Sequence, residues 1–490
     1  MPHDQLAELL AELQDSRELV RISAEVDADL EIAALTHRAC RLSGGGPVLF
    51  FERVRGASVP VVTNLFGSYA RMSRYLGGES FDAVADRMSG LIQPRVAEGW
   101  FEQVKLIPQF TQLGKLPPRL VRVAACQQVV RLGRDIDLDA WPIPRLWPDD
   151  EARLLTTGIV CLRHPHTQEP VVEQVPLEVR DAQSFRVHLT PQSAGWVVVR
   201  EHQRLRTPLS VAVAVGGDPL LTYVAGAPRP PGADAWLFAG FLRGAAVDLV
   251  TARTSDLELP AHAEVVFEGY IEPTEPWEPA SRVGLPTGYY GEPYPVPTLH
   301  LTAITSRTNP VLPVIVPDQP PQERYWLHKL TERLFLPVLR MVVPELVDYS
   351  FPHAAAQRHL AFVSIRKSYA GQARKVLSAL WGHPLTMHCK LLVVVDDEVD
   401  VQNPEAVWLA VGASMQPPRD LQVQDGPADW FDHSAPARGF GGKLGIDATR
   451  KLPEEHTGKA WPDQLAWPAE FEQTLDELWV KSPLAGWRAP

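Results

Sequence analysis

The sequence predicts three consecutive regions: an α/β region over residues 1–115, a mainly β region over 116–325, and a second α/β region with a tail over 326–490. Two observations predict this division. Short runs of β-branched residues, bounded by prolines, fill the central region, whereas apolar residues at helical spacing recur on both sides of it. With 490 residues, 45% hydrophobic and 22% charged, the chain has the size and composition of a globular protein of two or three domains.

The N-terminal region combines helices with short strands. In its first expected helix the apolar residues recur at helical spacing, at Leu6, Leu9, Leu10 and Leu13. A glycine-rich turn at 43–47 follows, then expected strands at 48–51 and 59–63 and an expected helix at 67–77.

The central region is expected to form a β-barrel or sandwich. Its β-branched runs predict strands at 120–125, 157–164, 195–201, 209–215, 263–271 and 299–307. The chain contains 46 prolines, more than the usual ~5% of residues, which indicates many ordered turns.

Helical periodicity returns in the C-terminal region, interleaved with strands. We expect helices at 323–342 and 371–382, strands at 360–366 and 391–395, and a last amphipathic helix near 468–481. The tail after Trp461 is expected to be a packed extension that docks on a neighbour.

Composition excludes several classes of function. The net charge of −12 repels a nucleic-acid backbone, and no basic run offsets it. The four cysteines form no CxxC pair, which argues against a zinc knuckle or a disulfide framework. The longest apolar stretches are far shorter than the ~20 residues of a membrane span. We therefore expect a cytoplasmic protein that binds neither nucleic acid nor membrane.

Local motifs for phosphate or metal binding are weak. The stretch GFGGKL at 439–444 lacks the first glycine and the final Ser or Thr of a phosphate-binding loop. The acidic run at 396–400 is compatible with a divalent cation, but acids at a helix N-terminus explain it better. The histidines of HPH at 164–166 have no third ligand at suitable spacing.

Three stretches in the same order resemble the UbiD decarboxylase family: SIRKSYAGQARKVLSALWG at 364–382, HCKLLVVVDDEVDV at 388–401 and GGKLGIDATRK at 441–451. Further family-like segments cover most of the remaining chain, at 60–77, 213–219, 238–244, 259–269 and 287–291. The chain is therefore identified as resembling UbiD over essentially its whole length.

The resemblance implies a fold and a chemistry. It implies an N-terminal α/β domain, a central split β-barrel like those of flavin-binding (flavin-reductase-like) proteins, and a C-terminal α/β domain, assembled into dimers or hexamers. Family members decarboxylate unsaturated or aromatic acids on prenylated FMN, whose phosphate binds manganese and potassium. A small organic substrate is implied here.

Two family site residues have matches in this sequence. Glu268, in VVFEG, matches a metal-binding Glu, and Lys390 matches a Lys that lies near the cofactor. We expect these two groups to form a pair in an apolar cavity, in a polar patch with Tyr289 and Tyr290. The pair is either catalytic, as a proton shuttle or carboxylate anchor, or a structural ion pair.

Other family site positions hold residues of a different chemistry. The metal-binding Asn and His, the substrate-binding Arg and the pair of catalytic Glu residues correspond in turn to Val171, Gln192, Pro176, Ala280 and Leu285. The chain's three asparagines, Asn64, Asn309 and Asn403, all lie away from the expected ligand position, so a shift of alignment does not restore the Asn. A shifted alignment could place Glu278 at a catalytic Glu position, Arg180 or Arg186 at the Arg position and His188 at the His position. All of these residues would have to act together.

Three hypotheses of function follow from these positions. The first is a repurposed enzyme that acts on a small unsaturated or aromatic molecule without prenylated FMN or metal. The second is a prenylated-FMN decarboxylase with unusual ligands, and the third is a non-catalytic partner subunit. The apolar replacements favour the first, because an anionic phosphate would lose its compensating groups.

Overall fold

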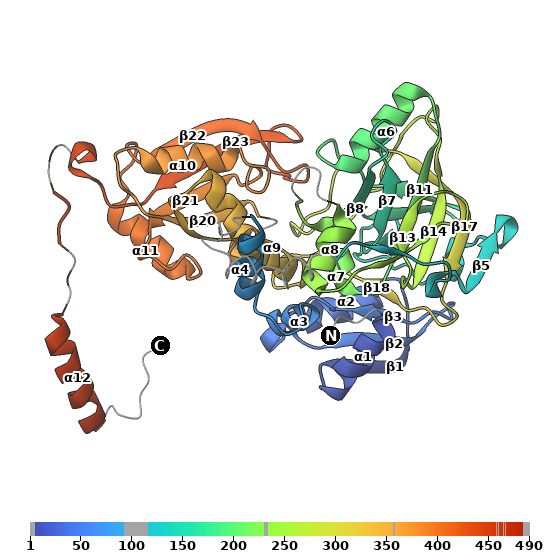
Figure 1. Ribbon diagram of the computed structural model, residues 1–490, viewed down its shortest axis with the longest axis horizontal. Helices are drawn as coiled ribbons and strands as arrows, with labels where there is room; N and C mark the ends of the chain where they lie inside the picture. The colour runs from blue at the N-terminus through green and yellow to red at the C-terminus, as the bar shows by residue number, and fades with distance from the viewer. Residues whose placement is uncertain are drawn as a thin grey trace, which may run out of the picture.

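The computed structural model of the chain describes residues 5–92, 116–229, 234–355 and 358–456, and most of 458–483. Figure 1 shows the N-terminal elements packed beneath a large central sheet, with the C-terminal sheet to one side and α9 (Glu323–Val342) at the junction. The expected boundary at 115 lies at the edge of a segment outside the described residues.

The N-terminal sheet has the strand order β1-β2-β3-β18. Its strands are β1 (Leu19–Val26), β2 (Val48–Val54), β3 (Val61–Thr63) and β18 (Leu312–Val314), the last from the far end of the central region. Its helices are α1 (Leu6–Asp15), α2 (Glu31–Ala39), the short η1 (Ser43–Gly45), α3 (Tyr69–Tyr75) and α4 (Phe81–Ile92). The predicted apolar face of α1 is buried, so this helix is confirmed.

The central sheet is a curled half-barrel of nine strands. Its order is β6-β9-β10-β17-β14-β11-β7-β8, with β5 also paired to β17. The strands are β5 (Val129–Leu132), β6 (Leu154–Leu155), β7 (Ile159–Arg163), β8 (Pro170–Gln174), β9 (Leu177–Asp181), β10 (Ser184–Val187), β11 (Leu209–Val215), β14 (Val265–Ile271) and β17 (Thr298–Ser306). Among the described residues β6 and β8 do not pair with each other, so the sheet stays open.

Smaller elements complete the central region. They are β4 (Arg119–Leu120), β12 (Asp248–Thr251), β13 (Glu258–Pro260), β15 (Glu278–Pro279), β16 (Pro295–Val296), η2 (Ala125–Gln127), η3 (Gly133–Asp135), η4 (Leu138–Ala140), α6 (Ala194–Leu205), α7 (Pro219–Gly226) and α8 (Ala235–Arg243).

Two of the predicted central strands are wrong. The run at 195–201 lies inside helix α6, because Ser193 caps the helix by accepting a hydrogen bond from the Trp196 amide, and Val198 and Val199 share its buried face. Only the first residue of the run at 120–125 is in a strand. The strongly apolar run at 209–215 is confirmed as β11.

The C-terminal sheet has the order β19-β20-β21-β23-β22. Its strands are β19 (Leu346–Ser350), β20 (Leu360–Ile365), β21 (Leu391–Asp396), β22 (Leu421–Pro427) and β23 (Phe440–Asp447), and its helices are η5 (His353–Ala355), α10 (Gln372–Trp381), α11 (Pro404–Ser414) and η6 (Pro453–Glu455). The two strands and two helices predicted here are confirmed.

One hydrophobic cluster runs through all three regions. It includes Leu10 of α1, Ala214 of β11, Leu334 of α9 and Leu392 of β21, all nearly or fully buried. A continuous core of this kind holds the central and C-terminal regions against each other.

The tail forms its predicted helix, and its docking on a neighbour stays a prediction. Helix α12 (Ala469–Lys481) forms as predicted, but Figure 1 shows it lying away from the rest of the chain. Leu478, Trp479 and Val480 on it are exposed.

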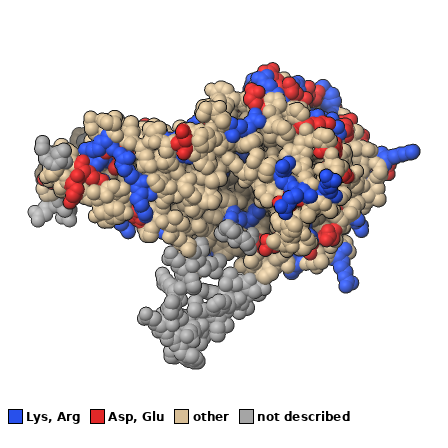
Figure 2. All heavy atoms as spheres, turned by 90° about the horizontal axis from the view of Figure 1, so that it is seen from above, with Lys and Arg blue, Asp and Glu red and all other residues tan. Residues whose placement is uncertain are grey.

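Figure 2 shows Lys and Arg interspersed with Asp and Glu on the face of the molecule that it draws. No described helix is long and apolar enough to cross a bilayer.

Candidate active site between the central and C-terminal regions

A cavity of about 310 Å³ lies between the half-barrel and the C-terminal region. The wall from the central region is formed by residues near β6, β8 and β10 and by two loops, with Glu173, Pro176, His188, Gln192, Leu285 and Ile315 among them. The opposite wall is formed by Arg324, Arg358, His388, Asp429, Trp430 and Phe431.

A buried imidazole–carboxylate pair forms the central wall. His188 directly follows β10, and its Nε2 lies 3.0 Å from Oε2 of Glu178, a fully buried residue on β9. Ser281 donates to the same carboxylate through Oγ (2.7 Å) and N (2.9 Å), and Arg186 donates at 2.5 Å. Burial alone would raise the pKa of Glu178, but the hydrogen bonds from His188 and Ser281 outweigh it and lower this pKa to about 2.

This arrangement orients the imidazole. With Nε2 bound to the carboxylate, Nδ1 of His188 has no hydrogen-bond partner among the described residues and is available to a molecule in the cavity. An imidazole fixed by a buried carboxylate is a common general acid–base arrangement.

Glu173 lies beside this pair at the end of β8. Its Oε2 accepts a hydrogen bond from the Gly195 amide, at the start of α6, at 2.9 Å. Burial raises the pKa of Glu173 despite this bond and the nearby Arg229 charge. Burial thus makes the ionised form of this carboxyl less favourable than it is in water.

Two arginines stand on the opposite wall. Arg324 is in the first turn of α9, and Arg358 precedes β20 with a left-handed backbone (φ 71°). Neither side chain forms a hydrogen bond or ion pair with any described residue, and Arg324 Nε is buried without a partner. Burial lowers the pKa of Arg324, and the charge of Arg358 lowers it further.

His388, Asp429 and Trp430 complete this wall. His388 Nδ1 lies 3.9 Å from Asp429 Oδ2. Burial would raise the pKa of Asp429, but the His388 imidazole and the Phe431 amide lower it below its usual range. Nε2 of His388 and Nε1 of Trp430 are buried without a partner among the described residues. Such groups at a cavity wall are suited to a polar ligand.

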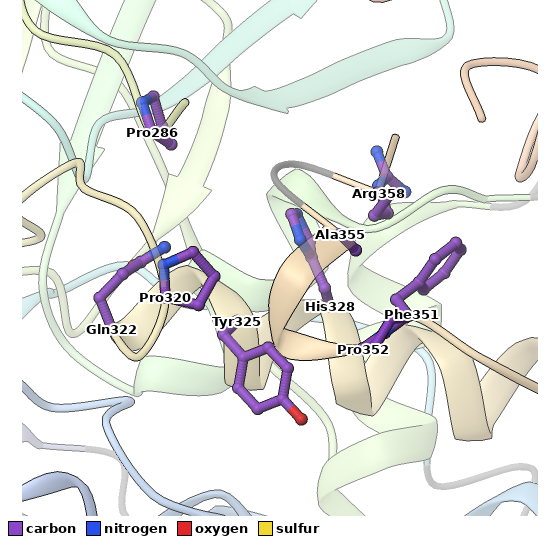
Figure 3. A pocket seen from close by; sticks show the side chains of 9 residues that line it. All are labelled: Pro286, Pro320, Gln322, Tyr325, His328, Phe351, Pro352, Ala355 and Arg358. Atoms are coloured by element: carbon purple, nitrogen blue, oxygen red, sulfur yellow. The ribbon is translucent and has the colours of Figure 1, made fainter. Parts of the chain in front are cut away.

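A small annex of about 20 Å³ adjoins the main cavity and shares Pro286 and Arg358 with it. Figure 3 shows Pro286 and Arg358 on opposite sides of this space, with His328 between them. Burial lowers the pKa of His328 well below its usual value, and the charges of Arg358 and Arg324 act in the same direction. This imidazole is therefore neutral.

The structure brings together three of the five altered family positions. Pro176, Gln192 and Leu285 line the cavity, and Gln192 Nε2 donates to the Ala428 carbonyl at 2.9 Å. Val171 packs against an apolar cluster of the half-barrel, and Ala280 is buried beside Tyr294. None of the five offers a carboxylate or imidazole to a metal.

The donor set does not fit a metal-bridged phosphate. Among the described residues no group of three or more His, Cys, Asp or Glu is arranged to hold a metal ion. The side chains of Val171 and Pro176, at the family's Asn and Arg positions, offer neither an oxygen ligand nor a charge.

Glu268 and Lys390 do not form the expected pair. Glu268, on β14, is fully buried and accepts from the amides of Arg253 (2.9 Å) and Thr254 (2.7 Å). Lys390 bonds Asp432 at 3.0 Å and Ser434 at 2.8 Å. Neither lines the cavity, because each side chain is engaged elsewhere.

The two tyrosines expected beside that pair also lie elsewhere. Tyr289 is 56% exposed and stacks on His433, and Tyr290 accepts a hydrogen bond from the Asp149 amide. Neither is among the residues that line the cavity.

The residues of the alternative alignment are partly assembled. Glu278 pairs with Arg180 (2.8 Å) and Arg186 (3.0 Å), but this cluster lies outside the cavity lining. His188 alone of this set reaches the cavity. Sequence reasoning missed Arg324, Arg358 and Glu178. The first two lie in a helix start and a loop, where an arginine carries no periodic signal.

Models of the UbiD (3-octaprenyl-4-hydroxybenzoate carboxy-lyase) family match nearly the whole chain. The N-terminal domain model matches residues 10–88, the Rift-related domain model 119–320 and the C-terminal domain model 325–448. The chain belongs to the UbiD family. The resemblance seen in the sequence is thereby confirmed, together with a central β domain between N- and C-terminal domains; the structure shows this β domain as an open half-barrel.

Similar proteins cover the full length. An uncharacterized protein of Aquifex aeolicus is 38% identical over 97% of both chains. The UbiD-class enzyme HmfF of Pelotomaculum thermopropionicum, in complex with FMN, is 28% identical and covers 96% of this chain and 99% of its own (TM-score 0.76). An evolved form of HmfF, in complex with prFMN, is dimeric.

Vanillic acid decarboxylase of Sedimentibacter hydroxybenzoicus is 26% identical, covering 98% of this chain and 99% of its own. The TM-score is 0.84 with its closed form and 0.77 with its open form. The overall fold of this chain is thus more similar to the closed form than to the open form.

Proposed function

We propose that this UbiD-family chain is an enzyme of the carboxy-lyase class that acts on a small aromatic or unsaturated acid by acid–base chemistry of its own residues. The observation that carries the proposal is the His188–Glu178 pair, which presents a free ring nitrogen to the cavity. The half-barrel cavity lies between domains in a family whose described activity is removal of a carboxyl group.

The chemistry assigned to His188 is proton transfer at carbon. For an aromatic acid, the imidazolium donates its Nδ1 proton to the ring carbon that bears the carboxylate, and a C–H bond forms from a ring π pair. The electron pair of the bond to the carboxylate then restores the π system as CO₂ leaves, and solvent reprotonates the imidazole. Glu178 stabilises the imidazolium and fixes its orientation.

The proposal includes the absence of prenylated FMN and its metals. Support comes from Val171, Gln192 and Pro176, which replace the groups that would hold metal or charge. Flavin absorbance of the protein purified after co-expression with the prenyltransferase tests this point. Near-stoichiometric bound flavin would contradict it and favour a decarboxylase with unusual ligands.

The catalytic proposal is tested with His188→Gln. Cleavage of 4-hydroxybenzoate and related hydroxylated or unsaturated acids is followed by CO₂ release, and exchange of solvent deuterium into the product carbon is measured beside it. We expect the variant to lose at least about 100-fold in kcat, as removal of a general acid does. His166→Gln is the matched control, because His166 pairs with Glu201 on an exposed surface away from the cavity.

Two outcomes would overturn the catalytic proposal. One is wild-type protein that neither releases CO₂ nor exchanges deuterium with any acid of the panel, which would favour a non-catalytic partner subunit. The other is His188→Gln with unchanged turnover.

We also propose that the chain forms a homo-oligomer through its C-terminal tail. Support comes from the exposed apolar residues of α12, which one chain leaves uncovered, among them Leu475, Leu478 and Trp479. Light scattering at micromolar concentration is expected to show at least a dimer. A monomer would contradict this.

A further inference from the structure

We infer that Arg324 and Arg358 form the binding site for the carboxylate of a monocarboxylic acid. This inference rests on the cavity of the proposed function, but not on the proton transfer assigned to His188. Both guanidinium groups line the same wall of that cavity.

The first argument is the lack of any internal partner. Ion pairs tie many other charged side chains, whereas the side chains of these two arginines form neither a hydrogen bond nor an ion pair within the described residues. A buried, unpaired arginine is costly unless a ligand supplies the counter-charge. Arg324 Nε, His388 Nε2 and Trp430 Nε1 are unpartnered on this one wall.

The second argument is that the local backbone does not favour these residues. Arg324 is in the first turn of α9, where the helix dipole favours an acidic side chain over a cation. Arg358 has a φ of 71°, a left-handed conformation that a side chain with a Cβ adopts at a cost. Two unfavourable placements that meet at one wall indicate selection for a ligand rather than for folding.

Both arginines are nevertheless firmly placed. The Arg324 amide donates to the side chain of Gln322, the N-cap of α9, at 2.6 Å. The Arg358 carbonyl accepts a hydrogen bond from Cys389 Sγ at 3.1 Å, next to the start of β21. These bonds fix the backbone from which both arginine side chains reach the cavity wall, so binding of a carboxylate has only the side chains to order.

The charges of the wall select the class of anion. Asp429 stays ionised because its pKa is lowered, so it offsets one of the two arginine charges. One positive charge is left on this wall, since His328 is neutral. A singly charged carboxylate neutralises this wall, whereas a phosphate monoester would bring an excess negative charge into a buried site.

The rest of the lining suits the body of such an acid. Apolar side chains face the arginines or flank them in the same cavity, namely Val283, Leu285, Pro286, Ile315, Trp430 and Phe431. A flat aromatic or unsaturated body would pack against these groups with its carboxylate toward the arginines.

The test is calorimetric binding to the full-length protein, with 4-hydroxybenzoate, its neutral methyl ester, inorganic phosphate and FMN as probes. Arg324→Gln and Arg358→Gln are compared with Arg340→Gln, which removes the same charge from the last turn of the same helix. We expect the acid to bind and the ester not to bind. Each cavity variant should weaken binding of the acid on the order of 10- to 100-fold, and Arg340→Gln should leave it unchanged.

Kinetics separate this inference from the proposed function. The carboxylate keeps its charge while the ring carbon is protonated, so with protonation as the slow step an anchor for it binds substrate and transition state alike. The arginine variants should then raise KM and leave kcat unchanged, while His188→Gln lowers kcat and leaves the Kd of 4-hydroxybenzoate unchanged. If the acid binds through both arginines but is not turned over, the proposed function is contradicted and the inference is supported.

Three results would overturn the inference. They are equal affinity for the acid and its ester, wild-type affinity in both Arg324→Gln and Arg358→Gln, and displacement of 4-hydroxybenzoate by phosphate or FMN. Melting temperatures are recorded for every variant, and Arg358→Gln serves on its own should Arg324→Gln fail to fold.

Discussion

The two walls of the cavity treat buried charge in opposite ways. On the central wall, the carboxylate of Glu178 receives hydrogen bonds from Arg186, His188 and Ser281. On the C-terminal wall, Arg324 and Arg358 have no partner within the described residues. A charge whose partners are all internal is fixed in place, whereas a charge without partners requires a ligand.

The contrast separates stability from binding. Substitution of residues of the central wall should lower the stability of the fold, as substitution in the core does, because it leaves other buried groups without a hydrogen-bond partner. Residues of the C-terminal wall should be dispensable for folding and necessary for ligand binding. Each prediction below tests one side of this contrast.

The largest effect is expected for Glu178→Leu. The change removes the anion and leaves Arg186, His188 and Ser281 without their shared acceptor, which should lower the free energy of unfolding by about 3–5 kcal/mol. Urea unfolding followed by circular dichroism measures it. A loss below about 1 kcal/mol would mean that the network is no more than a surface contact.

A loss of stability in acid follows from the same carboxylate. Its pKa is lowered from 4.5 to about 2 in the folded chain, so its contribution is complete above pH 4.5 and is lost as the pH falls toward 2. The contribution of this fully buried group is about 3 kcal/mol. Other carboxyls titrate in this range, so the measurement is the difference between wild type and Glu178→Gln, which should shrink as the pH falls.

Glu323, the neighbour of Arg324, should give the opposite pH dependence. Burial raises the pKa of Glu323 from 4.5 to about 7, with only partial relief from the Phe66 amide and the Arg71 charge. The folded chain therefore holds this proton more tightly, and stability should fall by about 3 kcal/mol as the pH rises from 4.5 to 7. Glu323→Gln should flatten this part of the profile, as measured by thermal unfolding. A variant with the wild-type slope would show that Glu323 is ionised in the fold.

The fold was largely predictable because its elements follow local patterns. The run 209–215 is continuously apolar and rich in valine, the stripe of α1 has a helical period, and both formed as predicted. The run 195–201 was wrongly predicted as a strand because its consecutive valines are typical of strands. The N-cap at Ser193 is the signal that indicates a helix instead. The open half-barrel depends on pairings between distant strands, which no local pattern contains.

The candidate site was less predictable. Gln192 and Leu285 were placed through family resemblance, and both line the cavity. Glu268 was expected there and is absent from the lining, because its carboxylate turns to the 253–254 amides. Arg358 meets Arg324 only through tertiary packing, since a helix start and a loop 34 positions apart in the numbering share no sequence signal.

Glu268→Gln should therefore behave as a structural change. The amide keeps one acceptor but turns a donor toward the amides of Arg253 and Thr254, so we expect a loss of about 1–3 kcal/mol in stability. Binding of 4-hydroxybenzoate and turnover should be unchanged once the variant is folded. Turnover lost at an unchanged melting temperature would return Glu268 to the mechanism.

The smallest effect, and the only one of reversed sign, is expected for Arg324→Leu in the absence of ligand. The change removes a buried cation that has no partner among the described residues and that opposes the dipole of α9, so the free energy of unfolding should stay constant or rise by up to about 1 kcal/mol. Addition of 4-hydroxybenzoate should then raise the melting temperature of the wild type and leave that of the variant unchanged, because only the wild type binds the carboxylate. Urea unfolding with and without the acid measures both parts. Destabilisation of the ligand-free variant by more than about 2 kcal/mol would show that Arg324 belongs to the core, and the contrast between the two walls would then fail.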